Sequence, residues 1–401
     1  MRTLVLSGYG SSLQVNGHTL EVYNGTDGGR KRFPAHQLPF NMVVAEGNSG
    51  FLSFEAARFL AIHDVPVVFL RWDGSILSTL LPRGPVAGDL KVAQFAAHVD
   101  ERKRREIARA ILEVKTSKSL ELLNFLSRFY PCSPNPVEAE VRRGVPHETI
   151  PGLMLWEGRV AAAYWAEFGK VVNRLWPDGG FVSRAGKGKS WAQSATDPVN
   201  ALLNYGYALL EARVRQAVNS VGLEPAVGFL HEVAPSKFPL VYDLQELFRW
   251  VVDLSVVETI AGRQLDRRGD FITTENYHIR LRPSAIGLLA ERLTENLHRT
   301  ILFGGQRRTL DAVLFEAVRT LARYLMGGSK TLDPGYPFVA FDRALTLRAA
   351  EEILSLSSAE RRALGVRANT FHYLKRRIAE GKPLRLYRKV ARRMGPVVLE
   401  T

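Results

Sequence analysis

Alternating apolar and polar positions predict β-strands in the first 80 residues of the chain. Residues 12–15 and 19–22 alternate on either side of Asn16-Gly17, and this pair favours a hairpin because both turn residues tolerate positive φ. Ser53 is suited to cap a following helix. The chain is therefore expected to begin with a small β-rich domain, residues 1–84, which contains one helix.

A helical period replaces this alternation beyond residues 81–88, a stretch rich in proline and glycine that we interpret as a linker. The predicted helices span residues 92–116, 119–129, 153–172, 199–221, 240–260, 283–302 and 310–326. They predict an all-helical domain over residues 89–328 and an α+β fold class for the whole chain.

The last segment, residues 346–401, is basic and has its own pattern. Ser357 and Glu360 have the spacing of a capping box, which opens one short helix, and a second helix is expected from residue 370 to 380. Two short helices around a glycine-containing turn indicate a helix-turn-helix-like tail, although a charged hairpin packed on the body is the alternative. The side chains expected to contact DNA from the second helix are Thr370, Tyr373 and Arg376.

Composition favours a polyanionic partner. The net charge is +14, which indicates nucleic acid before membrane, with a merely soluble basic protein as the alternative. Cys132 is the only cysteine, so disulfides within the chain and cysteine-rich zinc sites are excluded. The N-terminus lacks the apolar core of a signal peptide, and no uncharged apolar run reaches the ~18 residues of a membrane span. We therefore expect a cytoplasmic protein.

Two acids and a histidine suggest a site for a divalent metal. Asp243 and Glu246 are three residues apart, so a helix would place both carboxylates on one apolar face. Burying two acids there is costly unless a cation compensates them. Arg249 offers an alternative explanation, a salt bridge to Glu246 across one turn. His231 lies upstream, although a lone histidine is more often a structural residue.

Glu157 is the third acidic candidate, on an alanine-rich helix that other helices can approach closely. Its alternative role is that of an ordinary acid near the start of a packing helix. Glu157, His231 and Glu246, taken to lie on three separate helices, would supply one nitrogen and several oxygens. That set suits Mn²⁺ or Mg²⁺ better than Zn²⁺. A hard cation near a basic surface can polarise a phosphodiester and activate a hydroxyl nucleophile.

A basic loop precedes the histidine. It resembles a phosphate-binding loop, but Ser183 stands where the Walker pattern requires glycine and no buried strand leads into it, so ATP binding is rejected. Contact with DNA phosphates is preferred, and a solvated charged run is the alternative. The basic residues expected to contact DNA in this loop and after the histidine are Arg184, Lys187, Lys189 and Lys237.

Four ordered motifs resemble those of the CRISPR-associated endonuclease of the spacer-acquisition module. They are Glu157-Gly158, residues 197–207 (DPVNALLNYGY), residues 222–231 (GLEPAVGFLH) and residues 243–249 (DLQELFR). The resemblance implies an N-terminal β domain, a C-terminal helical domain and a homodimer. It also implies metal ligation by Glu157, His231 and Glu246, with Asp243 beside them, and DNA integration in which a 3′-hydroxyl attacks a target phosphodiester.

The tail departs from this resemblance, because family members encoded in CRISPR loci usually end near the position of Gly328. Casposases, the related integrases of mobile elements, often carry such tails. CRISPR adaptation, with the small second protein of that complex as a partner, and mobile-element integration therefore both remain open. We expect truncation after Gly328 to spare catalysis. A DNA-binding regulator without catalysis is a further alternative. A tyrosine recombinase is poorly supported, because residues 277–280 are the only part of the sequence that suggests one.

Overall fold

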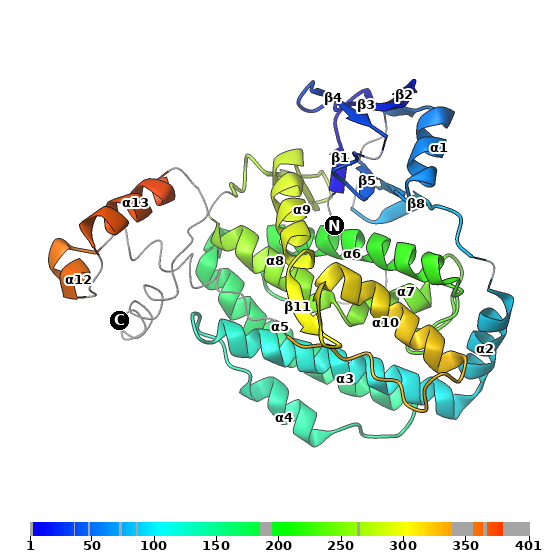
Figure 1. The fold of residues 1–401 in the computed structure, drawn as a ribbon. Coiled ribbons are helices and arrows are strands. Elements are labelled where there is room, and N and C mark those ends of the chain that lie inside the picture. The colour runs from blue at the N-terminus through cyan, green and yellow to red at the C-terminus, as the bar shows by residue number, and fades with distance from the viewer. Residues whose placement is uncertain are drawn as a thin grey trace.

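The protein combines a strand-rich end with a large body of long helices (Figure 1). The computed structural model describes residues 3–35, 37–46, 49–71, 74–85, 87–184, 195–262, 265–338, 356–363 and 367–379. The N-terminal strands lie at one edge of the helical body, above α6 and beside α9, as Figure 1 shows. The predicted division into an N-terminal β-rich part and a larger helical part is therefore confirmed.

Eight strands and one helix form the N-terminal part. The elements are β1 (Thr3–Leu6), β2 (Ser11–Asn16), β3 (Thr19–Tyr23), β4 (Arg30–Pro34), β5 (Met42–Ala45), β6 (Gly50–Leu52), α1 (Phe54–Ile62), β7 (Val67–Leu70) and β8 (Ile76–Leu80). One sheet has the order β1-β5-β7-β8 and the other β4-β3-β2-β6. The predicted hairpin joins β2 to β3, and Gly17 takes a positive φ of 59°. The predicted cap is also present, because Ser53 Oγ accepts from the amide of Ala56.

The first sheet shares its core with the helices. Met42 and Val44 of β5 belong to the large core of the helical body, whereas Val43 packs in a second core with α1, β2 and β3. Successive strand residues point to opposite faces, so a single strand contributes to both cores. The N-terminal part is thus joined to the helical body by a continuous apolar contact.

The helical body is built from long helices. Their bounds are α2 (Gly88–Val99), α3 (Glu101–Leu126), α4 (Asn135–Arg143), α5 (Ile150–Leu175), the short 3₁₀ helix Pro177–Gly179, α6 (Pro198–Val221), α7 (Pro239–Glu246), α8 (Arg249–Ala261), α9 (Pro283–Leu297) and α10 (Leu310–Leu325). The predicted helix over residues 92–116 is interrupted at Asp100, whose carboxylate accepts from the amides of Arg102 and Lys103 and so caps a new helix. The predicted helix over residues 119–129 is the end of that same helix, α3.

The prediction of an all-helical domain was wrong in two places. Short hairpins are formed by β9 (Phe271–Thr273) with β10 (Ile279–Leu281) and by β11 (Thr300–Phe303) with β12 (Gln306–Thr309). The predicted helix over residues 283–302 therefore extends too far. Its apolar pattern continues into β11, and the Gly304-Gly305 turn, with φ of 57° and 74°, reverses the chain.

The segment from residue 240 to 260 is likewise two helices, with a break at Leu247 and Phe248 between α7 and α8. The break matters for the site because it directly follows Glu246. None of the described helices combines the length and the apolar character that crossing a membrane requires.

Two helices of the tail are described, α12 (Ser358–Ala363) and α13 (Ala368–Ala379), and Figure 1 draws them apart from the helical body. The predicted capping box is confirmed. Ser357 Oγ accepts from the amide of Glu360 at 3.2 Å, and the Glu360 carboxylate accepts from the amide of Ser357 at 2.8 Å.

Candidate active site

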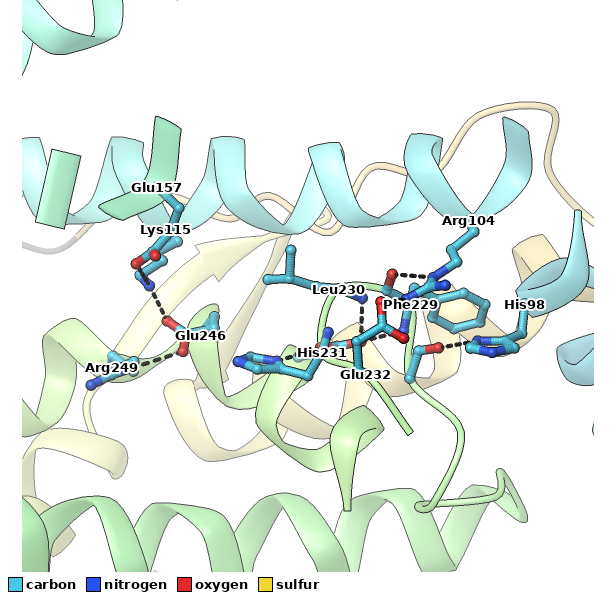
Figure 2. A network of polar contacts seen from close by, with 12 residues as sticks. His98, Arg104, Lys115, Glu157, Phe229, Leu230, His231, Glu232, Glu246 and Arg249 are labelled. Carbon is cyan, nitrogen blue, oxygen red and sulfur yellow. Dashed lines mark hydrogen bonds and ion pairs between the residues drawn. The ribbon is translucent and has the colours of Figure 1, made fainter. Parts of the chain in front are cut away.

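A lysine joins two of the three predicted acids. Lys115 on α3 places its Nζ 2.5 Å from Glu157 Oε1 on α5 and 2.6 Å from Glu246 Oε2 at the end of α7 (Figure 2). The other oxygen of Glu246 accepts from Arg249 Nη1 at 2.8 Å. Two carboxylates from distant parts of the sequence therefore converge on one cation, as the metal hypothesis requires. The salt bridge to Arg249, the alternative, is present as well.

Asp243 is dedicated to shaping the loop that carries His231. Its carboxylate is fully buried and accepts from the backbone amides of Phe229, Leu230 and His231. It also accepts from His231 Nδ1 at 2.7 Å. Gly228 permits this approach, because a Cβ there would lie 2.7 Å from Asp243 Oδ2. Asp243 thus orients the imidazole and fixes which ring nitrogen carries the proton.

The prediction that His231 lies on a helix was wrong. It lies in the loop between α6 and α7, where Gly222 ends α6 in a left-handed conformation and Pro239 opens α7. The opposite side of the loop is also held, since His98 Nδ1 donates to Gly228 O at 2.6 Å and Arg104 Nε donates to Phe229 O at 3.0 Å (Figure 2). Hydrogen bonds from two sides therefore hold this part of the loop although it is not helical.

Charge keeps the acid at the break ionised. Burial alone would raise the pKa of Glu246, but Arg249 and Lys115 outweigh it and lower the pKa to about 2. Burial alone would lower the pKa of His231, yet the hydrogen bond and charge of Asp243 raise it above its ordinary value. Figure 2 shows the imidazole directed toward the side where Glu246 and Arg249 lie.

A buried polar cluster packs against Arg249 on α8. Its guanidinium lies over the ring of Tyr207, 4.3 Å from the centroid. Asp253, one turn along α8, accepts from the hydroxyls of Tyr207 and Tyr164. This cluster connects α5, α6 and α8 next to the Glu246–Arg249 pair.

The donor set has the chemistry of a site for a hard divalent cation. Glu157 and Glu246 already share one positive charge, and His231 has Nδ1 engaged by Asp243, which leaves Nε2 for a metal. Across the described part of the chain, no three His, Cys, Asp or Glu side chains lie close enough together to hold one ion. A metal held by these residues would compete with the Lys115 ammonium for the two carboxylates.

The basic residues predicted to contact DNA fall into different environments. Arg184 is turned into the protein, where its Nη1 donates to Asn200 at 2.8 Å and to Asn204 at 2.9 Å and its guanidinium packs near Trp165. It is thus not held out to solvent as a flexible contact would be. Lys237 is exposed in the loop before α7. Lys187 and Lys189 lie outside the described residues.

Lys115 is the functional residue that the sequence reasoning missed. It stands on α3 one turn after Ile111 and seven residues before Leu122, both buried. A lysine in register with buried apolar residues needs a partner of opposite charge, because an unpaired buried ammonium is costly. This register is the signal that could have identified it. His98 and Arg104, which hold loop carbonyls, leave no comparable signal.

The fold agrees with a known family of proteins, which the comparison with family models identifies. The family model described as CRISPR associated protein Cas1 matches residues 4–295, so the chain belongs to the Cas1 family. A curated relative from Archaeoglobus fulgidus, a CRISPR-associated endonuclease Cas1, is 28% identical over 345 residues, which are 81% of this chain and 96% of the relative. A second such endonuclease, from Rhodospirillum rubrum, is 28% identical over 354 residues, 84% of this chain and 98% of the relative.

Solved structures agree in fold. A casposase bound to its integration product is 36% identical, with a TM-score of 0.76, and the match covers 84% of this chain and 94% of that one. A Cas1 protein from Thermotoga maritima is 20% identical with a TM-score of 0.68, covering 84% of this chain and all (100%) of that one, a likeness that shows the fold alone. The chain is thus similar to CRISPR-associated Cas1 endonucleases and to a casposase.

Proposed function

We propose that this chain is a divalent-metal-dependent DNA endonuclease and integrase that joins DNA 3′-hydroxyl ends to a target phosphodiester. The observation that carries the proposal is the convergence of Glu157 and Glu246 on one cation, beside an imidazole that Asp243 orients. A DNA-binding regulator would have no use for a buried acid and a half-buried acid that share a positive charge beside an oriented histidine. Mg²⁺- or Mn²⁺-dependent strand transfer on a plasmid, abolished by chelation, is the direct test.

The protein groups have distinct tasks in this proposal. Glu157, Glu246 and His231 Nε2 would hold the metal, which would act as a Lewis acid on the phosphodiester and on the attacking hydroxyl. Arg249 keeps Glu246 ionised and in place. Asp243 holds the proton on His231 Nδ1 and so keeps Nε2 free to bind. Lys115, which the metal would displace from the two carboxylates, would add a positive charge to the site.

Integration of a mobile element is the context that one specific observation favours. The casposase is 36% identical to this chain, whereas the two CRISPR endonucleases above are 28% identical. Spacer acquisition in a CRISPR system, with the small second protein of the adaptation complex, is the second candidate. We expect strand transfer by the chain alone, as a homodimer. Strict dependence on the second protein would reverse this preference.

The tail would supply contacts to target DNA. Thr370, Tyr373 and Arg376 recur every third residue on α13, and Tyr373 is 56% exposed. A helix presented with such side chains can enter a major groove, as the second helix of a helix-turn-helix does. Replacing Arg376 with alanine should relax the choice of integration site and leave cleavage intact. Sequencing of integration sites on one plasmid measures this.

Removal of the shared cation should make the fold depend on metal. In Lys115→Met, Glu157 and Glu246 face each other without the ammonium, and two close carboxylates repel. We expect the thermal midpoint in chelator to fall by several degrees, about 1–2 kcal/mol for a chain of this size, and Mn²⁺ to restore it more than in the wild type. Lys91→Met, which breaks an ion pair with Glu224 elsewhere, is the matched control. If Mn²⁺ does not raise the thermal midpoint of Lys115→Met, the result would count against the metal site.

Affinity for DNA should fall steeply with salt, because each phosphate contact releases counterions. Replacing Lys187 and Lys189 with alanine should reduce the slope of log affinity against log salt by about 0.9 per lost contact. Arg323→Ala, which removes a surface residue paired with Glu316, is the control. Titrations at four salt concentrations measure the slope. If the slope of the Lys187 and Lys189 variant equals that of the wild type and of the control, the loop is a solvent-exposed charged segment that does not contact DNA.

A further inference from the structure

The segment that follows α10 returns to the break between α7 and α8. Tyr336, in this segment, is buried there, and its hydroxyl donates to the carbonyl of Leu247 at 2.5 Å. The same oxygen accepts from Trp250 Nε1 at 2.7 Å. The phenol ring stacks on Phe248, with centroids 4.8 Å apart and an angle of 8° between the planes. A single side chain thus contacts both residues of the break and one residue of the first turn of α8.

These contacts surround the functional pair. Glu246 is the last residue of α7 and Arg249 is the first of α8, so the contacted residues, Leu247, Phe248 and Trp250, lie between them or directly beside them. Leu247 directly follows α7, and its carbonyl is the group that accepts the hydrogen bond from Tyr336. Helix ends leave backbone groups that need partners, and Tyr336 supplies one from a distant part of the chain.

The same segment also reaches α3, the helix of Lys115. Lys118, three residues beyond Lys115, places its Nζ 5.0 Å from the centre of the Tyr336 ring. Phe338 packs against Trp250, with centroids 4.8 Å apart, and lies 6.5 Å from Phe125 on α3. The segment therefore bridges the two elements whose side chains meet at Glu246.

We propose that Tyr336 is a positioning residue, which fixes the α7–α8 break and thereby the placement of Glu246 and Arg249 relative to Lys115. It lies beyond residues 4–295, the part of the chain that the family model matches. The proposal rests on the proposed function for its catalytic consequence, but its structural half can be tested without catalysis. It also moves the point at which the chain could be cut, because truncation after Gly328 would remove Tyr336.

The test compares Tyr336→Phe with Tyr324→Phe in the full chain. Tyr336→Phe keeps the stacked ring and removes both hydrogen bonds. We expect faster hydrogen exchange of the amides of residues 244–251, and Mn²⁺ binding weaker by roughly tenfold, as for other supporting partners of metal ligands. We expect kcat for strand transfer to fall roughly ten- to a hundredfold with KM for DNA unchanged, because a small misplacement is enough.

Tyr324 on α10 serves as the control, since it is a partly buried phenol that is hydrogen-bonded to Glu106, away from the break. Tyr324→Phe should change none of the three readouts. Unchanged exchange at residues 244–251 in Tyr336→Phe would overturn the proposal, as would a lower melting point with normal Mn²⁺ affinity and kcat. If Tyr336→Phe is insoluble, Phe338→Leu loosens the same segment and should shift the three readouts in the same direction. Wild-type protein without strand transfer would refute the proposed function while the exchange result still decides this one.

Discussion

Glu157→Gln, His231→Ala and Glu246→Gln should each lower strand transfer about 10³-fold, the effect expected when Lewis-acid stabilisation worth several kcal/mol is lost. The glutamines keep the volume of the side chains and remove the charge that a cation needs. Glu246 should be the most sensitive of the three, because Lys115 and Arg249 both lose a partner there. Rates measured at saturating Mn²⁺, with circular dichroism as the check on folding, give the answer.

Glu148→Gln is the matched control for this series. Glu148 is an exposed glutamate that pairs with Arg109 at the surface, so its loss should change the rate by less than about twofold, as surface ion pairs contribute little. Near-normal rates in Glu157→Gln, His231→Ala and Glu246→Gln would exclude metal ligation by these residues. A loss shared equally by Glu148→Gln would show that the assay reports general charge rather than the site.

The sequence was sufficient where a signal is local. The hairpin at Gly17, the cap at Ser53 and the capping box at Ser357 each depend on two or three neighbouring residues, and all three are present. The acids at Asp243 and Glu246 were also placed on one helix. The partners of each carboxylate were not predicted, apart from the Arg249 alternative, because the fold brings them from other parts of the chain.

The remainder depends on contacts between distant residues. Lys115 on α3 pairs with Glu157, which is 42 residues away on α5, and with Glu246, which is on α7. No sequence motif indicates contacts between such distant residues. Tyr336 reaches Leu247 across 89 positions. The expectation that truncation after Gly328 spares catalysis did not take this contact into account. The segment that follows the last predicted helix of the body is rich in glycine and proline, and it has no apolar period that would indicate where it packs.

Asp243→Asn should abolish most activity, although Asp243 orients the site and is not one of the three proposed metal ligands. Four hydrogens point at this carboxylate: the amides of Phe229 and Leu230 at Oδ2, and the amide and Nδ1 of His231 at Oδ1. An asparagine offers one oxygen, and its NH₂ group must face two of the four donors whichever way it is turned. Each buried donor left without an acceptor costs about 1–3 kcal/mol.

The loop should therefore leave its position, carrying His231 with it, and the rate should fall about 10²-fold or more. Asp311→Asn is the control that separates placement from stability. Asp311 is also buried and receives two hydrogen bonds from Arg213, but it lies on α10, away from the loop. We expect both variants to melt earlier and only Asp243→Asn to lose activity per folded molecule. Equal activity of the two folded variants would show that Asp243 stabilises the protein without positioning His231.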